Sequence, residues 1–207
     1  DTAVSFATEC LDRLHTTATS HRRIMVVEVM GRYAGWIALH AGIAGNAHVI
    51  LMPEIPYDID KVAEVIRERE RRGRLSTLVV VAEGAKPLDG EVSVLGKAVG
   101  QAEKLGGVGD KVAAALEART GRESRTVVLG HLLRGGSPTA FDRLVALRFG
   151  AAAVRALEQG LSSVMVSLAP PTVRYEPLEA AVSRMKTVSL DSDTMETARD
   201  LGIRFGD

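Results

Sequence analysis

Short apolar runs alternate along this chain with longer stretches of helical spacing, and this alternation limits the fold more than any other feature of the sequence. Buried strands are predicted where β-branched and aliphatic residues run together, at residues 24–29, 49–52, 78–82, 125–129 and 164–168. Helical spacing predicts helices at residues 2–18, 35–44, 111–119, 141–158, 178–185 and 193–201, and a further helix that Asp58 caps. Strands that alternate with helices of this length predict an α/β fold with a parallel sheet.

Two residues and one segment depart from this pattern. Glu28 interrupts the apolar run at residues 24–29, and a buried carboxylate needs a partner that the sequence does not name. His40 lies inside the apolar helix at residues 35–44, and we interpret it as a core histidine rather than a ligand. Residues 86–109 carry many glycines and little periodicity, which predicts a loop.

The composition is typical of a globular protein and excludes several function classes. Of 207 residues, 46% are hydrophobic and 25% charged, so the chain can bury a sizeable core. Its 26 basic residues balance 26 acidic ones, and no overall field attracts nucleic acid or an anionic membrane. No apolar run approaches the length of a membrane span. The single cysteine, Cys10, excludes an internal disulfide and fits a reducing, cytoplasmic location.

A cationic turn follows the predicted strand at residues 125–129. The stretch GHLLRGGSPT, at residues 130–139, presents His131 and Arg134 three residues apart, then two glycines and a helix start. Open α/β sheets bind ligands beyond the carboxyl ends of their strands, and a cationic pair of this kind suits a phosphate or a sugar phosphate. Taken alone, the stretch fits a tight turn with a solvated arginine equally well.

Two further turns that follow apolar runs favour the binding site. They are EVMGRYAGW at residues 28–36 and VAEG at residues 81–84. Together with GHLLRGGSPTAFDR at residues 130–143, and in this order, they resemble the 6-phosphofructokinase family over almost the whole chain. The resemblance covers the C-terminal portion of that enzyme. Because the chain starts at Asp1 rather than Met and opens directly into a helical pattern, we expect it to be a piece of a longer protein.

The resemblance implies a fold and a division into domains. The fold would be a three-layer parallel-sheet sandwich of the phosphofructokinase type. Residues 1–133 would form the fructose 6-phosphate-binding domain, residues 134–175 would belong to the phosphoryl-donor domain, and residues 176–207 would return to the substrate domain as C-terminal helices. The helix at residues 141–158 would then expose an apolar face in this chain.

The resemblance also implies which residues bind substrate. Met30, Gly31 and Arg32 would line the sugar end, near the transferred phosphoryl group. Glu83 would accept hydrogen bonds from the sugar hydroxyls, for which a carboxylate has the acceptor capacity. His131 and Arg134 would bind the 6-phosphate. Since all three motifs follow strands, their side chains can converge at one edge of the sheet.

Arg23 and Arg125 match family residues that bind the substrate phosphate, but both stand at the starts of strands. A strand of about six residues spans about 20 Å, so they cannot easily reach the ligand that Arg32 and His131 of the same subunit bind. We therefore expect them to serve the site of a neighbouring subunit, as the resemblance implies, in a homo-oligomer (a dimer or a homotetramer). The alternative is that both are exposed charges that flank strands.

The motifs that handle the phosphoryl donor in the family do not occur in this chain. A GGD-type motif would hold the donor and its Mg2+, and a TIDND-type motif would supply the base, so we assign neither a catalytic base nor a metal ligand here. The implied reaction is phosphoryl transfer to the 1-hydroxyl of fructose 6-phosphate in glycolysis, with ATP or pyrophosphate as donor. Alone, the chain should bind the sugar phosphate poorly or be inactive. The alternatives are a pyrophosphate-dependent phosphotransferase, a non-catalytic sugar-phosphate-binding module and an unrelated phosphate-binding protein with chance motif matches.

Of the positions that match the family's effector site, some keep the residue type of the family and others do not. His15 and His48 replace an arginine and a glutamate of the short bacterial enzymes, while Arg72 and Arg74 match basic positions. We expect activation by nucleoside diphosphates to be weak or absent. Leu133 replaces a more usual glutamine and should point away from the phosphate.

Overall fold

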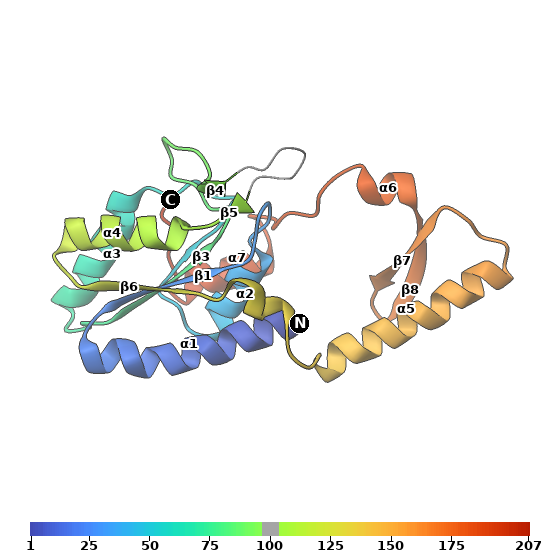
Figure 1. Cartoon of the computed structure of the whole chain (residues 1–207), viewed down its shortest axis with the longest axis horizontal. Helices are drawn as coiled ribbons and strands as arrows, with labels where there is room; N and C mark the ends of the chain where they lie inside the picture. The colour runs from blue at the N-terminus through green and yellow to red at the C-terminus, as the bar shows by residue number, and fades with distance from the viewer. Residues whose placement is uncertain (97–103) are drawn as a thin grey trace. The chain divides into compact units, whose positions relative to one another are not determined.

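The computed structural model describes residues 1–96 and 104–207. Residues 97–103, which belong to the loop predicted at 86–109, lie outside this description. The chain forms two compact units (Figure 1): residues 3–135 with 187–207, called the sheet unit below, and residues 1–2 with 136–186, called the hairpin unit. In the described part of the chain, no helix has the length and hydropathy needed to span a membrane.

A four-stranded parallel sheet organises the sheet unit, with β1 and β3 in its interior. Its strands lie in the order β2 (Val49–Leu51), β3 (Thr77–Ala82), β1 (Ile24–Val29), β6 (Ser124–Val128). The register with β3 runs from Ile24 opposite Thr77 to Val29 opposite Ala82, and β6 pairs with β1 over Ile24 to Glu28. The predicted parallel sheet is therefore confirmed for these four strands.

Helices cover both faces of this sheet, which confirms the three-layer arrangement. In Figure 1, α3 (Ile59–Arg71) and α4 (Val108–Thr120) lie on one side and α1 (Thr2–His21) and α2 (Trp36–Ala44) on the other, and α7 (Asp193–Asp200) packs into the core on the α1 and α2 side. Alternate residues of β1 enter the two cores: Met25 and Val27 face α1 and α2, whereas Ile24 and Val26 face α3 and α4. Burial on both faces explains why the strands read as continuous apolar runs rather than as alternating ones.

Local signals in this unit give most of the expected elements, with two corrections. The segment predicted as a loop at residues 86–109 contains the short strands Val94–Gly96 and Lys104–Leu105 and the start of α4. Asp58 caps α3, because its carboxylate accepts a hydrogen bond from the Asp60 N–H at 2.8 Å. The interpretation of His40 as a core histidine was wrong: its side chain is exposed and lies edge-on to Trp36, with ring centroids 5.5 Å apart. The buried face of α2 consists of small and aliphatic residues, namely Ala38, Leu39, Ala41 and Gly42.

The hairpin unit differs from the sequence prediction. It contains α5 (Ala140–Glu158), β7 (Val164–Ala169), β8 (Thr172–Pro177) and α6 (Leu178–Val182), and Pro170 and Pro171 lie in the connection between β7 and β8. The sheet unit contains a separate pair of short strands, β4 (Val94–Gly96) and β5 (Lys104–Leu105). β7 pairs antiparallel with β8 and is not part of the parallel sheet, and β8 was not predicted because charged and polar residues interrupt its apolar ones. The helix predicted at 178–185 ends at Val182.

An apolar face of α5 is exposed, as expected. Leu147 and Leu157 are 73% and 75% exposed, and Phe141, Leu144 and Val154 are also exposed. The chain passes from one unit to the other at residues 2/3, 135/136 and 186/187. The assignment of residues 1–133, 134–175 and 176–207 to functional domains stays a prediction.

The buried carboxylate of Glu28 has a partner at the start of α4. Glu28 is 4% exposed, and its carboxylate accepts a hydrogen bond from the Gly109 N–H at 2.8 Å. A side chain at position 109 would have no room, because a Cβ there would lie 3.0 Å from Glu28 Oε2 and 2.9 Å from a methyl carbon of Thr126. The unpaired N–H groups of a first helical turn favour a carboxylate. The long-range contact answers a question that the sequence left open.

Burial raises the pKa of Glu28 above its ordinary value, and the nearby Glu83 and Asp110 carboxylates act in the same direction. A carboxyl group whose pKa is higher in the folded chain binds its proton more readily when the chain is folded. Its contribution to stability is therefore largest at acid pH and falls as the pH rises from the ordinary glutamate range through the raised pKa.

We expect Glu28→Gln to remove this pH dependence, because the amide keeps a carbonyl acceptor for Gly109 and cannot ionise. The difference in melting temperature, variant minus parent, should grow as the pH rises from 4 to the raised pKa and be constant above it. Thermal unfolding followed by circular dichroism from pH 4 to 8 measures this difference. Glu64→Gln, at an exposed position of α3, is the control and should give a flat difference. A difference for Glu28→Gln that shrinks with rising pH would contradict the assignment.

Candidate sugar-phosphate site

Three turns leave the sheet at its carboxyl-terminal edge and meet around one cavity. They are the loop after β1, the turn after β3 and the 3-10 helix η1 (Gly130–Arg134) after β6. Since β1 pairs in parallel with both β3 and β6, all three turns leave at the same edge. The cavity has a volume of about 480 Å³ and is lined by Met30, Gly31, Arg32, Ala34, Trp36, Ile37, Glu83, His131 and Arg134. The six residues predicted to bind substrate from this chain thus lie together.

Backbone hydrogen bonds hold the first two turns against each other. The Glu83 N–H donates to the Val29 carbonyl at 2.9 Å, and the Gly84 N–H donates to the Gly31 carbonyl at 3.0 Å. The Glu83 carboxylate lies 3.5 Å from the Gly31 nitrogen. Glu83 is therefore placed at the cavity wall by the backbone, and its oxygens can accept hydrogen bonds from hydroxyl groups.

The space between these turns admits no side chain at position 84. A Cβ on Gly84 would lie 2.0 Å from the carbonyl oxygen of Arg32. Gly84 is thus required by the close approach of two backbone segments, one of which carries Arg32. The Arg32 guanidinium lies over the ring of Tyr33, 5.1 Å from its centroid.

The η1 helix presents the two remaining predicted ligands of the phosphate. His131 and Arg134 are exposed, and residues three apart lie above one another in a 3-10 helix. Leu133 between them is 4% exposed and belongs to the core, so it does point away from the cavity, as expected. The cavity therefore combines cationic donors with one carboxylate, an arrangement that suits an anionic ligand that also carries hydroxyl groups.

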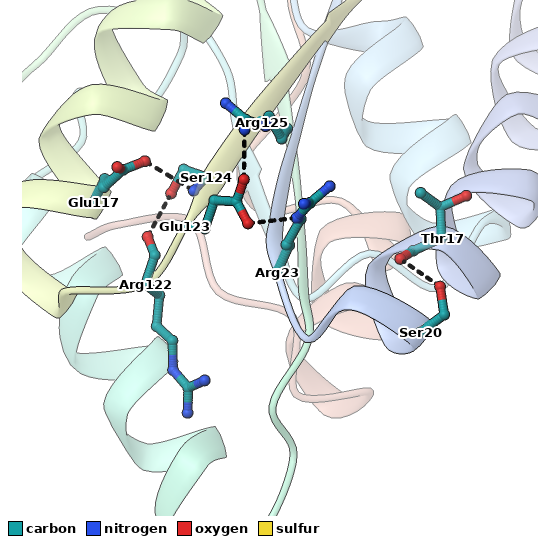
Figure 2. A network of polar contacts seen from close by, with 8 residues as sticks. All are labelled: Thr17, Ser20, Arg23, Glu117, Arg122, Glu123, Ser124 and Arg125. Carbon is teal, nitrogen blue, oxygen red and sulfur yellow. Dashed lines mark hydrogen bonds and ion pairs between the residues drawn. The ribbon is translucent and has the colours of Figure 1, made fainter.

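Arg23 and Arg125 lie at the opposite end of the same strands, as predicted. Arg23 immediately precedes β1, and Arg125 is opposite Met25 in the register of β6. Figure 2 shows both arginines turned toward Glu123, whose carboxylate accepts from Arg23 Nε at 2.6 Å and from an Arg125 terminal nitrogen at 2.5 Å. The hydrogen bond from Arg23, together with the charges of both arginines, lowers the pKa of Glu123. The pair thus forms a cationic cluster of its own, away from the cavity.

The positions that match the family's effector site also come together. A second cavity, of about 490 Å³, is lined by Arg72, Arg74 and His48, with Arg69 and Arg204 beside them. His48 accepts a hydrogen bond from the Leu78 N–H at 2.8 Å, and burial, with smaller effects of Arg69 and His15, lowers its pKa to about 3. The imidazole at position 48 is therefore neutral at physiological pH. The expectation about nucleoside diphosphates stays a prediction.

The described residues give no assignment for a metal ion. Among them, no group of three or more His, Cys, Asp and Glu side chains could hold a metal, and Glu83 is the sole carboxylate at the cavity. Mg2+ prefers several oxygen ligands in an octahedral arrangement, which this wall does not offer. We therefore derive no chemical step through a metal bound by these residues.

Comparison with known proteins identifies the family. Residues 1–157 match the family model described as Phosphofructokinase. The chain belongs to the phosphofructokinase family. It is 50% identical, over all its length and 57% of the relative, to the ATP-dependent 6-phosphofructokinase of Chloroflexus aurantiacus. It is also 50% identical, over all its length and 59% of the relative, to the pyrophosphate–fructose 6-phosphate 1-phosphotransferase of Streptomyces coelicolor.

Solved structures of the family show the same fold. The phosphofructokinase of Saccharomyces cerevisiae matches with a TM-score of 0.75 and 31% identity over 97% of this chain and 26% of that one. A pyrophosphate-dependent phosphofructokinase from Marinobacter aquaeolei matches with a TM-score of 0.78 over 97% of this chain and 53% of that one; at 23% identity it supports the fold alone. The chain spans somewhat under three fifths of the length of the two curated relatives.

Sequence reasoning missed part of the cavity wall. Ala34, just before α2, and Trp36 and Ile37 in its first turn line the cavity, although the sequence analysis assigned no site residue to this apolar helix. It also missed Glu54, whose carboxylate accepts a hydrogen bond from the Gly35 N–H. The position of Glu54 just after β2 was the available signal, since the other site residues also follow strands.

We expect Gly84→Ala to destabilise the sheet unit by about 1–3 kcal/mol, because its Cβ would force the Glu83 turn and the Arg32 backbone apart. Gly135→Ala is the control in the same unit: Gly135 has extended backbone angles, and its Cβ would meet only the Leu132 carbonyl oxygen, at 3.6 Å. Urea unfolding of both variants gives the comparison. Equal midpoints for the two variants would show that the turns can separate without cost.

Proposed function

We propose that this chain carries the acceptor site of a 6-phosphofructokinase, which transfers a phosphoryl group to the 1-hydroxyl of fructose 6-phosphate and forms fructose 1,6-bisphosphate in glycolysis. The observation that carries the proposal is the convergence of Arg32, Glu83, His131 and Arg134 from three strand ends on one cavity. A volume of about 480 Å³ lies within the usual range of small-molecule sites, which is roughly 300–1,000 Å³.

Different residues bind the two ends of the sugar phosphate. His131 and Arg134 bind the 6-phosphate by charge-assisted hydrogen bonds, which are stronger than neutral ones. Glu83 accepts hydrogen bonds from the sugar hydroxyls. Met30, Gly31 and Arg32 lie at the other end of the substrate, where the positive charge of Arg32 stabilises the charge that develops on the transferred group.

The donor is ATP or pyrophosphate, accompanied by Mg2+. Relatives of both kinds are about equally similar to this chain, with 50% identity to each of the two compared. Mg2+ bound with the donor would neutralise charge on the donor phosphates, and no residue of this chain is assigned to hold it. The residues of this chain bind and orient the acceptor, and the base that takes the proton of the 1-hydroxyl is not assigned to any of them.

A second copy of the chain completes the site. Arg23 and Arg125 serve the substrate phosphate of a neighbouring subunit in a homodimer or homotetramer, which the cluster around Glu123 supports by placing both guanidinium groups together on the surface. We place the protein in the cytoplasm, in keeping with its single free cysteine, Cys10.

A non-catalytic sugar-phosphate-binding module is the second candidate. It is favoured by one observation: the acceptor cavity is assembled within the sheet unit, whereas no residue of this chain is assigned as the base. An assay of phosphoryl transfer distinguishes the enzyme from the binding module. The chain is joined to the segment that its relatives have and it does not cover, and ATP and pyrophosphate are each supplied as donor. Product formation with either donor supports the enzyme and names the donor.

We expect Arg134→Ala to weaken the binding of fructose 6-phosphate roughly 10- to 100-fold, because a hydrogen bond to a charged group contributes about 1.5–3 kcal/mol. NMR titration of the chain with fructose 6-phosphate measures the affinity. Arg13→Ala is the control, since that exposed arginine pairs with Glu9 on α1 and such surface pairs contribute little. Unchanged affinity in Arg134→Ala would remove the basis of the proposed function.

We expect chains with Arg134→Ala and chains with Arg125→Ala to complement each other when mixed. In a two-fold oligomer, one site of each hybrid pair contains both substitutions and the other contains neither. Random mixing should therefore restore roughly a quarter of the fructose 6-phosphate sites, whereas each variant alone binds weakly. Capture of the mixture through a tag carried by one variant alone checks that hybrids form. Hybrids that restore no site would mean that Arg125 does not serve a neighbour.

A further inference from the structure

Glu54 lies outside the cavity wall, in a turn whose backbone is fixed. The turn runs from Met52 to Ile55 and is closed by a hydrogen bond from the Ile55 N–H to the Met52 carbonyl at 3.2 Å. Pro53 occupies the second position of the turn, where its restricted φ is favourable. The side chains of Met52 and Ile55 are buried in the core on either side. The turn therefore holds the base of the Glu54 side chain in one place.

The carboxylate of Glu54 binds backbone donors from two distant segments. The Gly35 N–H lies 3.1 Å from Oε1 and 3.0 Å from Oε2, and the Val188 N–H donates to Oε1 at 2.9 Å. Val188 belongs to the first residues after the chain returns to the sheet unit at Thr187. One acidic side chain thus joins the turn after β2, the start of α2 and the returning C-terminal segment.

At the start of α2, Glu54 supplies the hydrogen-bond acceptor for the N-cap N–H, which no side chain of the first turn can supply. Gly35 is the N-cap residue and has no side chain, and the residue three positions later is Ala38, which has no acceptor. In many helices a glutamate at that later position accepts the N-cap N–H. Here the acceptor comes from another loop, so the start of α2 depends on a tertiary contact.

The loop that carries Arg32 is fastened at both ends. Its first end is held by the hydrogen bond from the Gly84 N–H to the Gly31 carbonyl at 3.0 Å. Its second end is held at Gly35 by Glu54. No side chain fits at that end, since a Cβ on Gly35 would lie 2.4 Å from the Cβ of Met52. Releasing Gly35 would free the backbone between Gly31 and the first turn of α2.

We propose that Glu54 is a positioning residue for the sugar end of the site, because it holds at Gly35 the loop that presents Arg32 and the first turn of α2 to the cavity. The inference rests on the proposed function of that cavity. His131 and Arg134 do not depend on Glu54, since η1 is held by the buried Leu133 and by the hydrogen bond from the Leu129 N–H to the Glu28 carbonyl at 2.9 Å. Loss of Glu54 should therefore affect the sugar end and spare the phosphate end.

The test compares two ligands, fructose 6-phosphate and inorganic phosphate. In Glu54→Gln, a single carbonyl oxygen remains and an amide NH2 faces a backbone donor. We expect the affinity for fructose 6-phosphate to fall roughly tenfold, which corresponds to the loss of about one hydrogen bond to a charged group, and the affinity for inorganic phosphate to stay within about twofold. NMR titration of the whole chain measures both. Glu64→Gln on α3 is the matched control and should change neither affinity.

The remaining outcomes are decisive as well. Equal weakening of both ligands, or no change in either, would overturn the positioning role. If Glu54→Gln lowers the melting temperature strongly, Glu54→Asp, which keeps the charge on a shorter side chain, is measured with the same two ligands and interpreted in the same way. Arg134→Ala is measured in parallel: if it leaves inorganic phosphate binding unchanged, the proposed function of the cavity fails, whatever the Glu54 variants do.

Discussion

The parallel pairing of β1 with strands on both sides is the constraint on which the site depends. Parallel strands end at the same edge, so a residue just beyond β1, β3 or β6 reaches the same space without any long loop. Burial of the sheet on both faces leaves the strand ends as the places where polar side chains can gather at low cost. The close approach of Gly84 to the Arg32 backbone follows from the same geometry, because two adjacent strand ends must turn away within one strand spacing.

The same geometry separates the two groups of cations. β1 has six residues and spans about 20 Å, so Arg23 at its start and Arg32 beyond its end cannot approach one small anion. Glu123 holds Arg23 and Arg125 together while accepting one donor from each, and a guanidinium has five. Arg23 and Arg125 thus form a cationic cluster at the strand starts, at the opposite edge of the sheet from the cavity. Under the proposed function, they serve the site of a second copy.

Much of the fold and of the cavity could be predicted because the signals were local or followed from strand order. The runs at residues 24–29 and 78–82 coincide with β1 and β3 to within one residue, and the rule about strand ends predicted where Glu83 and His131 would meet. What failed depended on contacts between distant segments or on mixed patterns. The partner of Glu28 is a helix start 81 residues away, and Glu54 contacts Val188 across 134 residues. β8 mixes apolar residues with charged and polar ones, such as Arg174 and Glu176, and follows two prolines. Its sequence therefore indicated neither the helical nor the strand pattern of apolar residues. The interpretation of His40 as a core histidine was wrong because an apolar helix can still expose one side to solvent, and His40 lies on that side.

Under the proposed function, recognition of the acceptor and transfer of the phosphoryl group would be separable in this chain. Every residue that lines the candidate cavity comes from the sheet unit, and the bonds that hold them, from Gly84 to Gly31, from Leu129 to Glu28 and from Glu54 to Gly35, also lie within that unit. The hairpin unit contributes none of them, and its α5 leaves Leu147 and Leu157 exposed. The contacts that hold the cavity wall lie inside the sheet unit, so under the proposed function the binding of a sugar phosphate would require neither a catalytic base nor a donor. Under that function, defects in binding can be measured independently of defects in catalysis.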